Sequence, residues 1–337
     1  MAILVTGGVG YIGSHTVVEL LDANQQVIIV DNLSNANVNA LDRIRQITGK
    51  DCTFYQGSVL NKALLHKIFT DHVIDSVIHF AGLKAVGESV TNPLQYYETN
   101  VTGSIILCQV MAEHNVKKLV FSSSATVYGL PESLPIREDF ATGATNPYGQ
   151  SKLMVEQLLA DLYAADNQWN IAVLRYFNPV GAHKSGLIGE DPSDIPNNLM
   201  PFICQVAIGN IKELHVFGND YLTPDGTGVR DYIHVEDLAT GHIKALNKLS
   251  ENPGIVTYNL GTGRGYSVIE LITAFEQASG KTIPYRFTDR RTGDLAAYFA
   301  DASLAYKELD WQPTHTLESM VKSSWRWQSK NPKGYRE

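Results

Sequence analysis

The chain has 337 residues, of which 44% are hydrophobic and 18% are charged, so it is long enough to bury a large core in one or two domains. Its net charge of -8, without a basic block or stripe, excludes nucleic acid as the main partner. No apolar stretch approaches the roughly 20 residues that span a bilayer, and no cleavable signal precedes the first apolar run.

Cysteine and histidine usage argues against disulfide and metal chemistry. The three cysteines, Cys52, Cys108 and Cys204, lie far apart and are odd in number, so they show neither a disulfide framework nor zinc spacing. The ten histidines are scattered, without a cluster at metal-ligand spacing. We therefore expect a cytoplasmic protein with no membrane anchor and no metal site.

The first half of the chain alternates short apolar runs with longer amphipathic ones. Six apolar runs are typical of buried strands: residues 3–5, 27–30, 53–55, 77–80, 119–121 and 172–174. Helical patterns lie between them, for example at residues 12–21, 63–69 and 105–112. This alternation predicts an α/β fold with a Rossmann-type doubly wound parallel sheet, covered by helices on both faces.

A glycine-rich turn follows the first apolar run directly. Residues 7–13 form the sequence Gly-Gly-Val-Gly-Tyr-Ile-Gly, which matches Gly-x-Gly-x-x-Gly between a strand and a helix. Such glycines permit a tight turn and close approach of the backbone to a pyrophosphate, which the helix N-terminus then faces. Asp31 lies 18 residues beyond Gly13, close to the ~20-residue spacing of a carboxylate on a ribose 2'-hydroxyl. Because that carboxylate would repel a 2'-phosphate, the sequence predicts a site for NAD rather than NADP.

Polar residues follow the fourth and fifth apolar runs, at the edge where open parallel sheets bind ligands. Residues 80–84 are Phe-Ala-Gly-Leu-Lys, and residues 122–129 are Ser-Ser-Ser-Ala-Thr-Val-Tyr-Gly. These hydroxyls could simply cap a turn or a following helix. The motif that comes next along the chain favours a functional role.

Tyr148 and Lys152 stand one helical turn apart, so both side chains project from the same face of a helix. The pKa of a free tyrosine is about 10, and an ammonium held beside the phenol favours the phenolate. Such a pair alone also occurs on many solvated helices. Beside a serine hydroxyl and a nicotinamide, it makes a hydride-transfer site with a built-in proton shuttle.

Together these motifs resemble the extended short-chain dehydrogenase/reductase superfamily. Three longer runs, residues 79–90, 174–182 and 227–235, are similar to those of the UDP-glucose 4-epimerases (UDP-galactose 4-epimerases) within it, and the resemblance covers essentially the whole chain. It implies reversible, NAD-dependent epimerisation at C4' of UDP-galactose and UDP-glucose, as used in galactose metabolism. Tyr148 would remove the proton from the sugar 4'-hydroxyl with Ser124 as relay, and Lys152 would lower the pKa of Tyr148 and bind the nicotinamide ribose. Hydride would pass to a tightly bound NAD, leaving a 4-keto sugar, and would return to its other face.

The resemblance also implies two sets of binding residues and a division into domains. Residues 1–177 would form the NAD-binding Rossmann domain, and residues 178–337 mainly the substrate domain for the UDP-sugar, a smaller α/β unit with some segments returning to the first. The cofactor contacts would be Gly7, Gly10, Tyr11, Ile12, Gly13, Asp31, Asn32, Ser58, Val59, Phe80, Ala81, Lys84, Thr99, Ser124, Tyr148, Lys152 and Phe177. The substrate contacts would be Ser124, Thr126, Tyr148, Asn178, Asn198, Leu199, Phe217, Arg230, Arg291, Asp294 and Tyr298.

Three positions modify this expectation. Ser58 stands where the family usually has an Asp that binds the adenine amino group, and Thr99 stands where an Asn is common. The resemblance therefore does not fix the effect of these two residues on the affinity for NAD. Tyr298 matches a position at which a bulky residue restricts relatives to UDP-glucose and UDP-galactose. A phenol there would exclude an acetamido group, which predicts poor turnover of UDP-N-acetylglucosamine.

The sequence also allows other functions, other residue roles and another oligomeric state. A sugar-nucleotide 4,6-dehydratase would need Asp-Glu directly after Thr126, which this chain lacks, whereas a net reductase or decarboxylase would consume NAD or NADH. A non-catalytic NAD-sensing module would suit a chain without Tyr148 or Lys152. Ser124 could be structural, with Thr126 the next candidate, and Arg230 or Asp294 could be merely solvated. Residues 93–112 and 148–165 match helices that pair across a two-fold axis in the family, which implies a homodimer, although the residues alone also allow a monomer.

Overall fold

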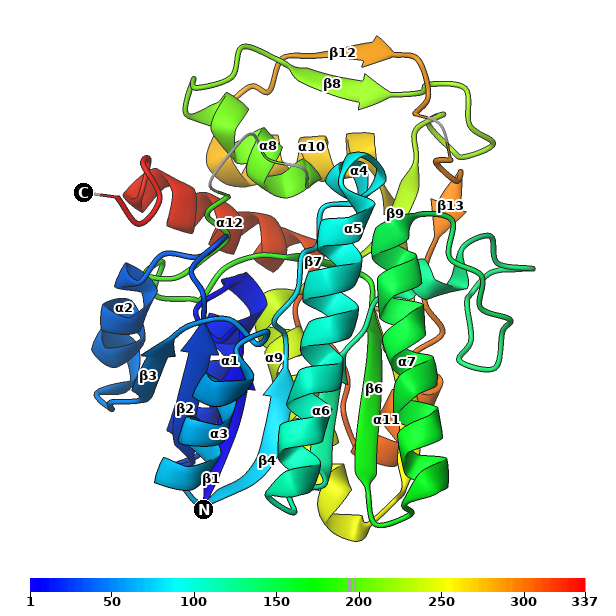
Figure 1. The fold of residues 1–337 in the computed structure, drawn as a ribbon. Coiled ribbons are helices and arrows are strands. Elements are labelled where there is room, and N and C mark those ends of the chain that lie inside the picture. Colours follow the sequence, from blue (N-terminus) through cyan, green and yellow to red (C-terminus); the bar gives the residue numbers. More distant parts are fainter. Residues whose placement is uncertain (193–195, 197, 292, 337) are drawn as a thin grey trace.

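The computed structural model describes residues 1–192, 196, 198–291 and 293–336. Its larger part is a seven-stranded sheet in the order β10-β6-β5-β4-β1-β2-β3, with every neighbouring pair parallel (Figure 1). The strands are β1 (Ala2–Thr6), β2 (Gln26–Asp31), β3 (Thr53–Gln56), β4 (Ile74–His79), β5 (Lys118–Ser122), β6 (Asn170–Tyr176) and β10 (Ile255–Leu260). The expected Rossmann-type parallel sheet is confirmed, and β10 is an additional strand that the sequence pattern did not reveal.

Helices cover both faces of this sheet, and a hydrophobic cluster lies beneath each helical layer. Successive strand residues point to opposite faces, so Ile3 and Val5 join one cluster and Leu4 joins the other. The first layer contains α1 (Tyr11–Asp22), α2 (Asn39–Thr48), α9 (Val235–Lys248) and α11 (Ser303–Leu309). The second contains α3 (Lys62–Asp71), α6 (Gly103–Glu113) and α7 (Pro147–Ala165), which face the viewer in Figure 1.

A smaller part with its own hydrophobic core lies above the carboxyl ends of the large sheet (Figure 1). Strands β11, β9, β13 and β7 form one small sheet, and β8 and β12 form a two-stranded ribbon. These strands are β7 (Asn178–Val180), β8 (Leu214–Phe217), β9 (Val229–His234), β11 (Gly265–Ser267), β12 (Tyr285–Thr288) and β13 (Ala297–Tyr298). The accompanying helices are α8 (Leu199–Ala207), α10 (Val268–Ser279) and α12 (Leu317–Lys330).

Short helical segments carry the chain across the carboxyl edge of the large sheet. They are α4 (Val86–Thr91), α5 (Pro93–Tyr96), a π-helix (Tyr97–Thr102) and a 3-10 helix (Ala125–Tyr128), with a further 3-10 turn (Leu249–Glu251) after α9. The start of α7 is fixed locally, because Asn146 caps the helix by accepting the amide hydrogen of Gly149 and Pro147 occupies the first turn. This cap places Tyr148 in the first turn of α7, at the sheet edge.

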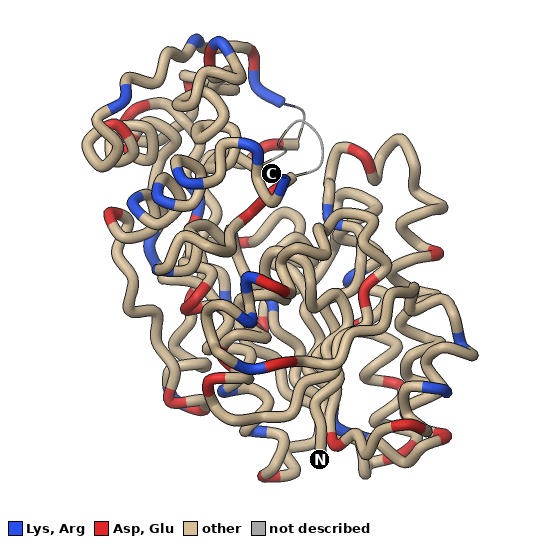
Figure 2. The backbone as a smooth tube through the Cα atoms, turned by 90° about the vertical axis from the view of Figure 1, so that its left-hand side faces the viewer, with Lys and Arg blue, Asp and Glu red and all other residues tan. Residues whose placement is uncertain are grey.

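For the described residues, the distribution of charged residues and the length of the apolar helices are not unusual. Basic and acidic positions are interspersed along the tube in Figure 2. Among the described helices, none combines the length and apolar character that crossing a membrane requires.

Candidate active site

The glycine-rich turn between β1 and α1 lies directly against the end of β4. Gly7 has a φ of +70°, and a Cβ atom added there would lie 2.8 Å from the amide nitrogen of Ala81. A Cβ at Gly13 would lie 2.2 Å from the carbonyl oxygen of Gly7. No side chain fits at either position, so the backbone of the turn stays open at the N-terminus of α1, where the first-turn amides have no intrahelical acceptor. This geometry suits a pyrophosphate.

Asp31 ends β2 beside this turn and is only 8% exposed. Its Oδ2 accepts the amide hydrogen of Val9 (3.1 Å) and its Oδ1 accepts that of Leu33 (2.9 Å). Burial raises the pKa of Asp31, and these amide hydrogen bonds act in the opposite direction. The carboxylate is therefore fixed next to the turn, while the neighbouring Asn32 is exposed and accepts the amide hydrogen of Ser34.

The hydroxyl, phenol and ammonium that the sequence singled out are brought together at the carboxyl ends of β4 and β5. Tyr148 and Lys152 are only 7% and 5% exposed. The phenol of Tyr148 lies close enough to Ser124 for the serine hydroxyl to favour the phenolate. Ser124 Oγ accepts the hydroxyl hydrogen of Thr126 at 3.0 Å. Lys152 Nζ donates to the carbonyl oxygen of Ser122 at 2.9 Å. The three groups thus lie on one wall, formed by β5 and α7.

Burial shifts the pKa of both α7 residues toward their neutral forms. It raises the pKa of Tyr148 above the ordinary value, and the hydrogen bond with Ser124 and the charge of Lys84 oppose this rise. It lowers the pKa of Lys152 to about 8, and the charge of Glu156 opposes this fall. The cation that favours the Tyr148 phenolate here is Lys84, so the lowering of its pKa by Lys152 stays a prediction.

Asn100 is a site residue that the sequence analysis missed. It is 3% exposed in the π-helix, next to half-buried Thr99, and its amide group bonds both backbone groups of Leu83 (2.8 and 3.0 Å). Its Nδ2 also donates to the hydroxyl of Ser151 (2.8 Å), between the two α7 residues. Asn100 therefore holds the segment after β4 against α7. Asn100 stands among polar residues such as Glu98 and Thr99, so no local sequence signal distinguished it. Its place in a π-helix is the structural signal, because π-helices are frequent at functional sites.

The other expected cofactor residues line the same edge of the sheet. Ala81 follows β4, and its amide donates to Thr6. Tyr11 opens α1 and donates its phenol hydrogen to the carbonyl oxygen of Gly181 (2.7 Å). Ser58 accepts the amide hydrogen of Leu60 (3.2 Å). The remaining members lie in the α1 turn, after β3, after β4 and after β6: Gly10, Ile12, Val59, Phe80 and Phe177.

Four of the expected substrate residues form a second group in the smaller part. Arg291 pairs with Asp294 (2.9 Å), and its guanidinium lies 4.8 Å from the ring centre of Phe217. Arg230 reaches Asp294 at 3.7 Å and donates to the carbonyl oxygen of Leu295. Two guanidinium groups are therefore held side by side through one carboxylate, an arrangement suited to a diphosphate.

The remaining expected substrate residues belong to neither of these two groups. Tyr298 donates its phenol hydrogen to the carbonyl oxygen of Ala125 (2.6 Å), directly after Ser124. Asn198 and Lys84 both bind Oε1 of Glu190 at 3.0 Å, and Glu190 is a second residue that the sequence analysis missed. Asn178 is exposed at the start of β7, and Leu199 is half-buried at the start of α8.

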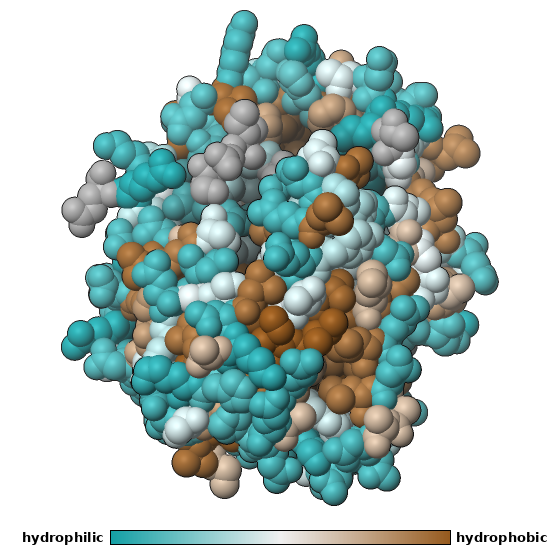
Figure 3. Space-filling view, viewed as in Figure 1, coloured by the Kyte–Doolittle hydropathy of each residue, from teal (hydrophilic) through white to brown (hydrophobic). Residues whose placement is uncertain are grey.

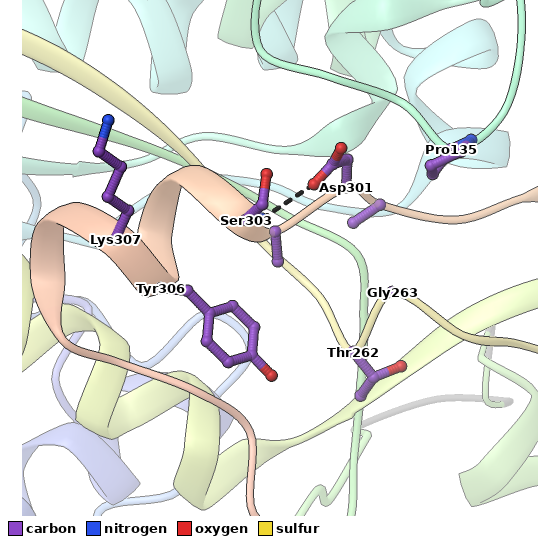
Figure 4. A pocket seen from close by; sticks show the side chains of 9 residues that line it. Pro135, Thr262, Gly263, Asp301, Ser303, Tyr306 and Lys307 are labelled. Carbon is purple, nitrogen blue, oxygen red and sulfur yellow. Dashed lines mark hydrogen bonds between the residues drawn. The ribbon is translucent and has the colours of Figure 1, made fainter.

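An open cavity of about 530 Å³ lies apart from these residues (Figure 4). It is lined by the loop after β10 and the start of α11, where Ser303 donates its amide hydrogen to Asp301. None of the expected site residues lines this cavity. We therefore place the candidate active site at the sheet edge around Tyr148.

Comparison with known proteins assigns the chain to a family. The NAD dependent epimerase/dehydratase family matches residues 3–261, and the chain therefore belongs to this family. Within it, the chain is similar to UDP-glucose 4-epimerases: that of Bacillus subtilis (strain 168) is 61% identical over 336 residues, which are 100% of this chain and 99% of the relative.

Solved structures agree with this assignment. The UDP-glucose 4-epimerase from Bifidobacterium longum in complex with NAD+ and UDP is 56% identical, with a TM-score of 0.96 over 99% of this chain and 100% of the other. The one from Stenotrophomonas maltophila, with bound NAD and formylated UDP-arabinopyranose, is 52% identical, with a TM-score of 0.97 over 98% and 99%. The family resemblance expected from the sequence, the class of NAD-dependent epimerases and the cofactor are confirmed by these relatives.

Proposed function

We propose that this chain interconverts UDP-galactose and UDP-glucose by oxidation and reduction at C4' of the sugar, with Tyr148, Ser124 and Lys152 as its catalytic residues. The observation that carries the proposal is the wall of β5 and α7, where the phenol, the hydroxyl and the ammonium lie together beside the glycine-rich turn. The named relatives support the substrate class.

The chain's own residues move and hold the proton. The phenolate form of Tyr148, beside Ser124, would accept the proton of the 4'-hydroxyl, and the resulting phenol would give it back after the sugar has turned. When bound, NAD would supply a hydride acceptor for C4' and, once reduced, a hydride donor to the other face of the sugar. Burial of Tyr148 and Lys152 excludes water, so the 4-keto sugar is protected while it turns.

The NAD site fits the residues present. The Gly7–Gly13 turn leaves its backbone open to a pyrophosphate, and Asp31 stands where a ribose hydroxyl would bind. Lys152 would hold the nicotinamide ribose, and Thr99 and Ser58 would lie along the same cofactor. The further contacts proposed are Gly10, Tyr11, Ile12, Asn32, Val59, Phe80, Ala81, Lys84 and Phe177.

The substrate would bridge the two parts of the chain. Arg230 and Arg291 would bind the diphosphate and Phe217 the uracil, with Asp294 beside them. Near the sugar the proposed contacts are Thr126, Asn178, Asn198, Leu199 and Tyr298. We accordingly propose residues 1–177 as the cofactor domain and residues 178–337 as mainly the substrate domain, with β10 and α9 packed on the former.

We also propose a cytoplasmic homodimer. The free thiols of Cys52, Cys108 and Cys204 suit a reducing compartment. Figure 3 shows hydrophobic residues gathered over α6 and α7. The partly exposed apolar residues of these two helices include Ile105, Met154, Leu158 and Leu162. An apolar face on two adjacent helices is suited to pairing with its own copy across a two-fold axis.

The activity is tested by incubating the purified protein with UDP-galactose, without added cofactor, and following UDP-glucose by NMR. The proposal predicts conversion to an equilibrium mixture with no net consumption of NAD or NADH. Denaturing the protein should release NAD rather than NADP. Absence of UDP-glucose, with and without supplementary NAD, would disprove the assignment, whereas steady consumption of the dinucleotide would indicate a net reductase or decarboxylase.

A further inference from the structure

Three consecutive serines, at and directly after the end of β5, lie against three residues that are spaced one helical turn apart on α7. Ser124 lies beside the phenol of Tyr148, and the carbonyl oxygen of Ser122 accepts a hydrogen bond from Lys152 (2.9 Å). Between them, the hydroxyl of Ser123 donates to the carboxylate of Glu156. The first two contacts belong to the proposed catalytic wall, whereas Glu156 lies one turn further along the same face of α7.

Glu156 is held from its other side by Arg175 of β6. Arg175 Nη2 lies 2.6 Å from Oε2 of Glu156, its Nε lies 3.1 Å from Oε1, and both residues are 8% exposed. The same guanidinium lies 4.8 Å from the ring centre of Tyr128, in the 3-10 helix that follows Ser124. One buried ion pair therefore joins β5, β6, α7 and the segment that carries the proposed proton relay.

A buried ion pair is weak evidence for stability, because removing two charges from water offsets much of their attraction. Its directional hydrogen bonds do fix how the joined elements lie relative to one another. Here the fixed elements carry the three reacting groups. A small displacement of α7 along β5 would separate Tyr148 from Ser124 and Lys152 from Ser122 together.

We propose that Glu156, held between Ser123 and Arg175, is a positioning residue that keeps α7 in the register the reaction needs. The proposal rests on the proposed function, since it assigns a role within the same site. Glu156 touches neither the sugar nor the nicotinamide in this role and acts through Lys152 and Ser123. Its charge also opposes the effect of burial on the Lys152 ammonium, which it helps to keep protonated.

The first test compares Glu156→Gln with Asp161→Asn, which removes the same charge from an exposed position on the same helix. For Glu156→Gln we expect kcat for UDP-galactose to fall roughly 10- to 100-fold with KM changed little, as for misplaced catalytic groups. The alkaline limb of its pH–kcat profile should move to lower pH, because the Lys152 ammonium loses its neighbouring carboxylate. Asp161→Asn should change neither quantity.

The second test restores the carboxylate from solution. Glu156 and Arg175 border an open cavity of about 340 Å³, so a small anion can reach the gap left by Glu156→Ala. Formate should raise the kcat of this variant several-fold and leave Asp161→Asn unaffected. If Glu156→Ala does not fold, Ser123→Ala removes only the hydroxyl that holds Glu156 and should lower kcat in the same direction.

The outcomes separate positioning from a merely structural role. A variant that unfolds at lower temperature but retains the kcat and pH profile of the control would overturn the proposal, as would a formate effect equal in both variants. If the wild-type protein makes no UDP-glucose, the proposed function is wrong. The positioning role is then tested by comparing crystal structures of the wild-type protein and Glu156→Gln. Glu156→Gln must then lengthen the 2.9 Å contact between Lys152 and Ser122, and an unchanged contact refutes it.

Discussion

Tyr148 is deeply buried and lies beside the hydroxyl of Ser124, and these two features act on its pKa in opposite directions. A phenol is neutral at pH 7 even in water, and burial raises the pKa of Tyr148 further above its ordinary value. Proton transfer therefore depends on groups that favour the phenolate, namely Ser124 and Lys84 here and, as we propose, Lys152 when the cofactor is bound. The role that we propose for this residue is to exchange a proton, which a phenyl ring cannot do.

Replacing Tyr148 with Phe should lower kcat by about 10²- to 10⁴-fold, the usual contribution of a positioned acid–base group, while NAD content and fold are retained. Steady-state kinetics and nucleotide release measure these two quantities. Tyr163→Phe is the matched control, because it removes a phenol from the same helix far from Ser124. Equal activity of the two variants would exclude Tyr148 as the acid–base residue.

Tyr298 should restrict the substrate. Its phenol donates to the carbonyl oxygen of Ala125, one residue beyond Ser124, so in the proposed site it would limit the space beside the sugar. We expect kcat/KM for UDP-N-acetylglucosamine to lie at least about 10-fold below that for UDP-glucose, and Tyr298→Ser to narrow the gap. Comparable kcat/KM values for both sugars in the wild-type protein would show that this interpretation is wrong.

At the scale of elements, the β1–α1 turn depends on a close approach that only glycine allows. Gly7→Ala would bring a methyl group to 2.8 Å from the backbone of Ala81 at a positive φ. We expect the variant to lose most of its bound NAD, measured by nucleotide release. Gly280→Ala has a similar φ of +66° with open space around it, so it isolates the backbone strain and should retain NAD. Retention of NAD by Gly7→Ala would contradict the assignment of the turn.

The start of α9 is tied to the segment before α12 by an imidazolium. His315 Nδ1 lies 2.9 Å from Asp237 and its Nε2 lies 3.3 Å from Glu236, while its ring stacks on His234. The hydrogen bonds to Asp237 and Glu236 raise the pKa of His315 to about 9. Since the folded-state pKa lies above the ordinary 6.5, the added stability is fully present below pH 6.5 and is lost as pH rises through about 9.

Urea unfolding of the wild-type protein and of His315→Gln tests this linkage. The free-energy difference between them should be largest near pH 6 and should shrink toward pH 9.5. Taking the difference removes contributions from groups such as Lys152, which titrate in both proteins. A difference that is independent of pH would show that His315 is uncharged.

For the molecule as a whole, the apolar face on α6 and α7 predicts a homodimer. Light scattering on the eluted protein should give twice the chain mass of 37.1 kDa. Met154→Arg places a charge on this face and should shift the protein to the monomer, whereas Leu222→Arg alters a fully exposed residue elsewhere and should not. A wild-type mass of one chain would contradict the proposed dimer.

The large sheet could be predicted from sequence because each of its first six strands is a short apolar run beside an amphipathic helix. β10 was missed because it joins the sheet next to β6 from some eighty residues further along the chain, so pairing rather than pattern defines it. The candidate site shows the same difference between residues in local motifs and residues defined by long-range contacts. The glycine turn and Tyr148-x-x-x-Lys152 are local motifs, whereas Asn100, Glu190 and Glu156 acquire their partners only when distant segments meet.

The central claim is that one carbon loses and regains its hydrogen within a closed site. It is tested most directly with UDP-galactose that carries deuterium at C4' of the sugar, in ordinary water and without added cofactor. We predict UDP-glucose that retains the deuterium at C4', because the hydride returns from bound NAD to the carbon it left. UDP-glucose with hydrogen from the solvent at C4', or no UDP-glucose at all, would contradict the account.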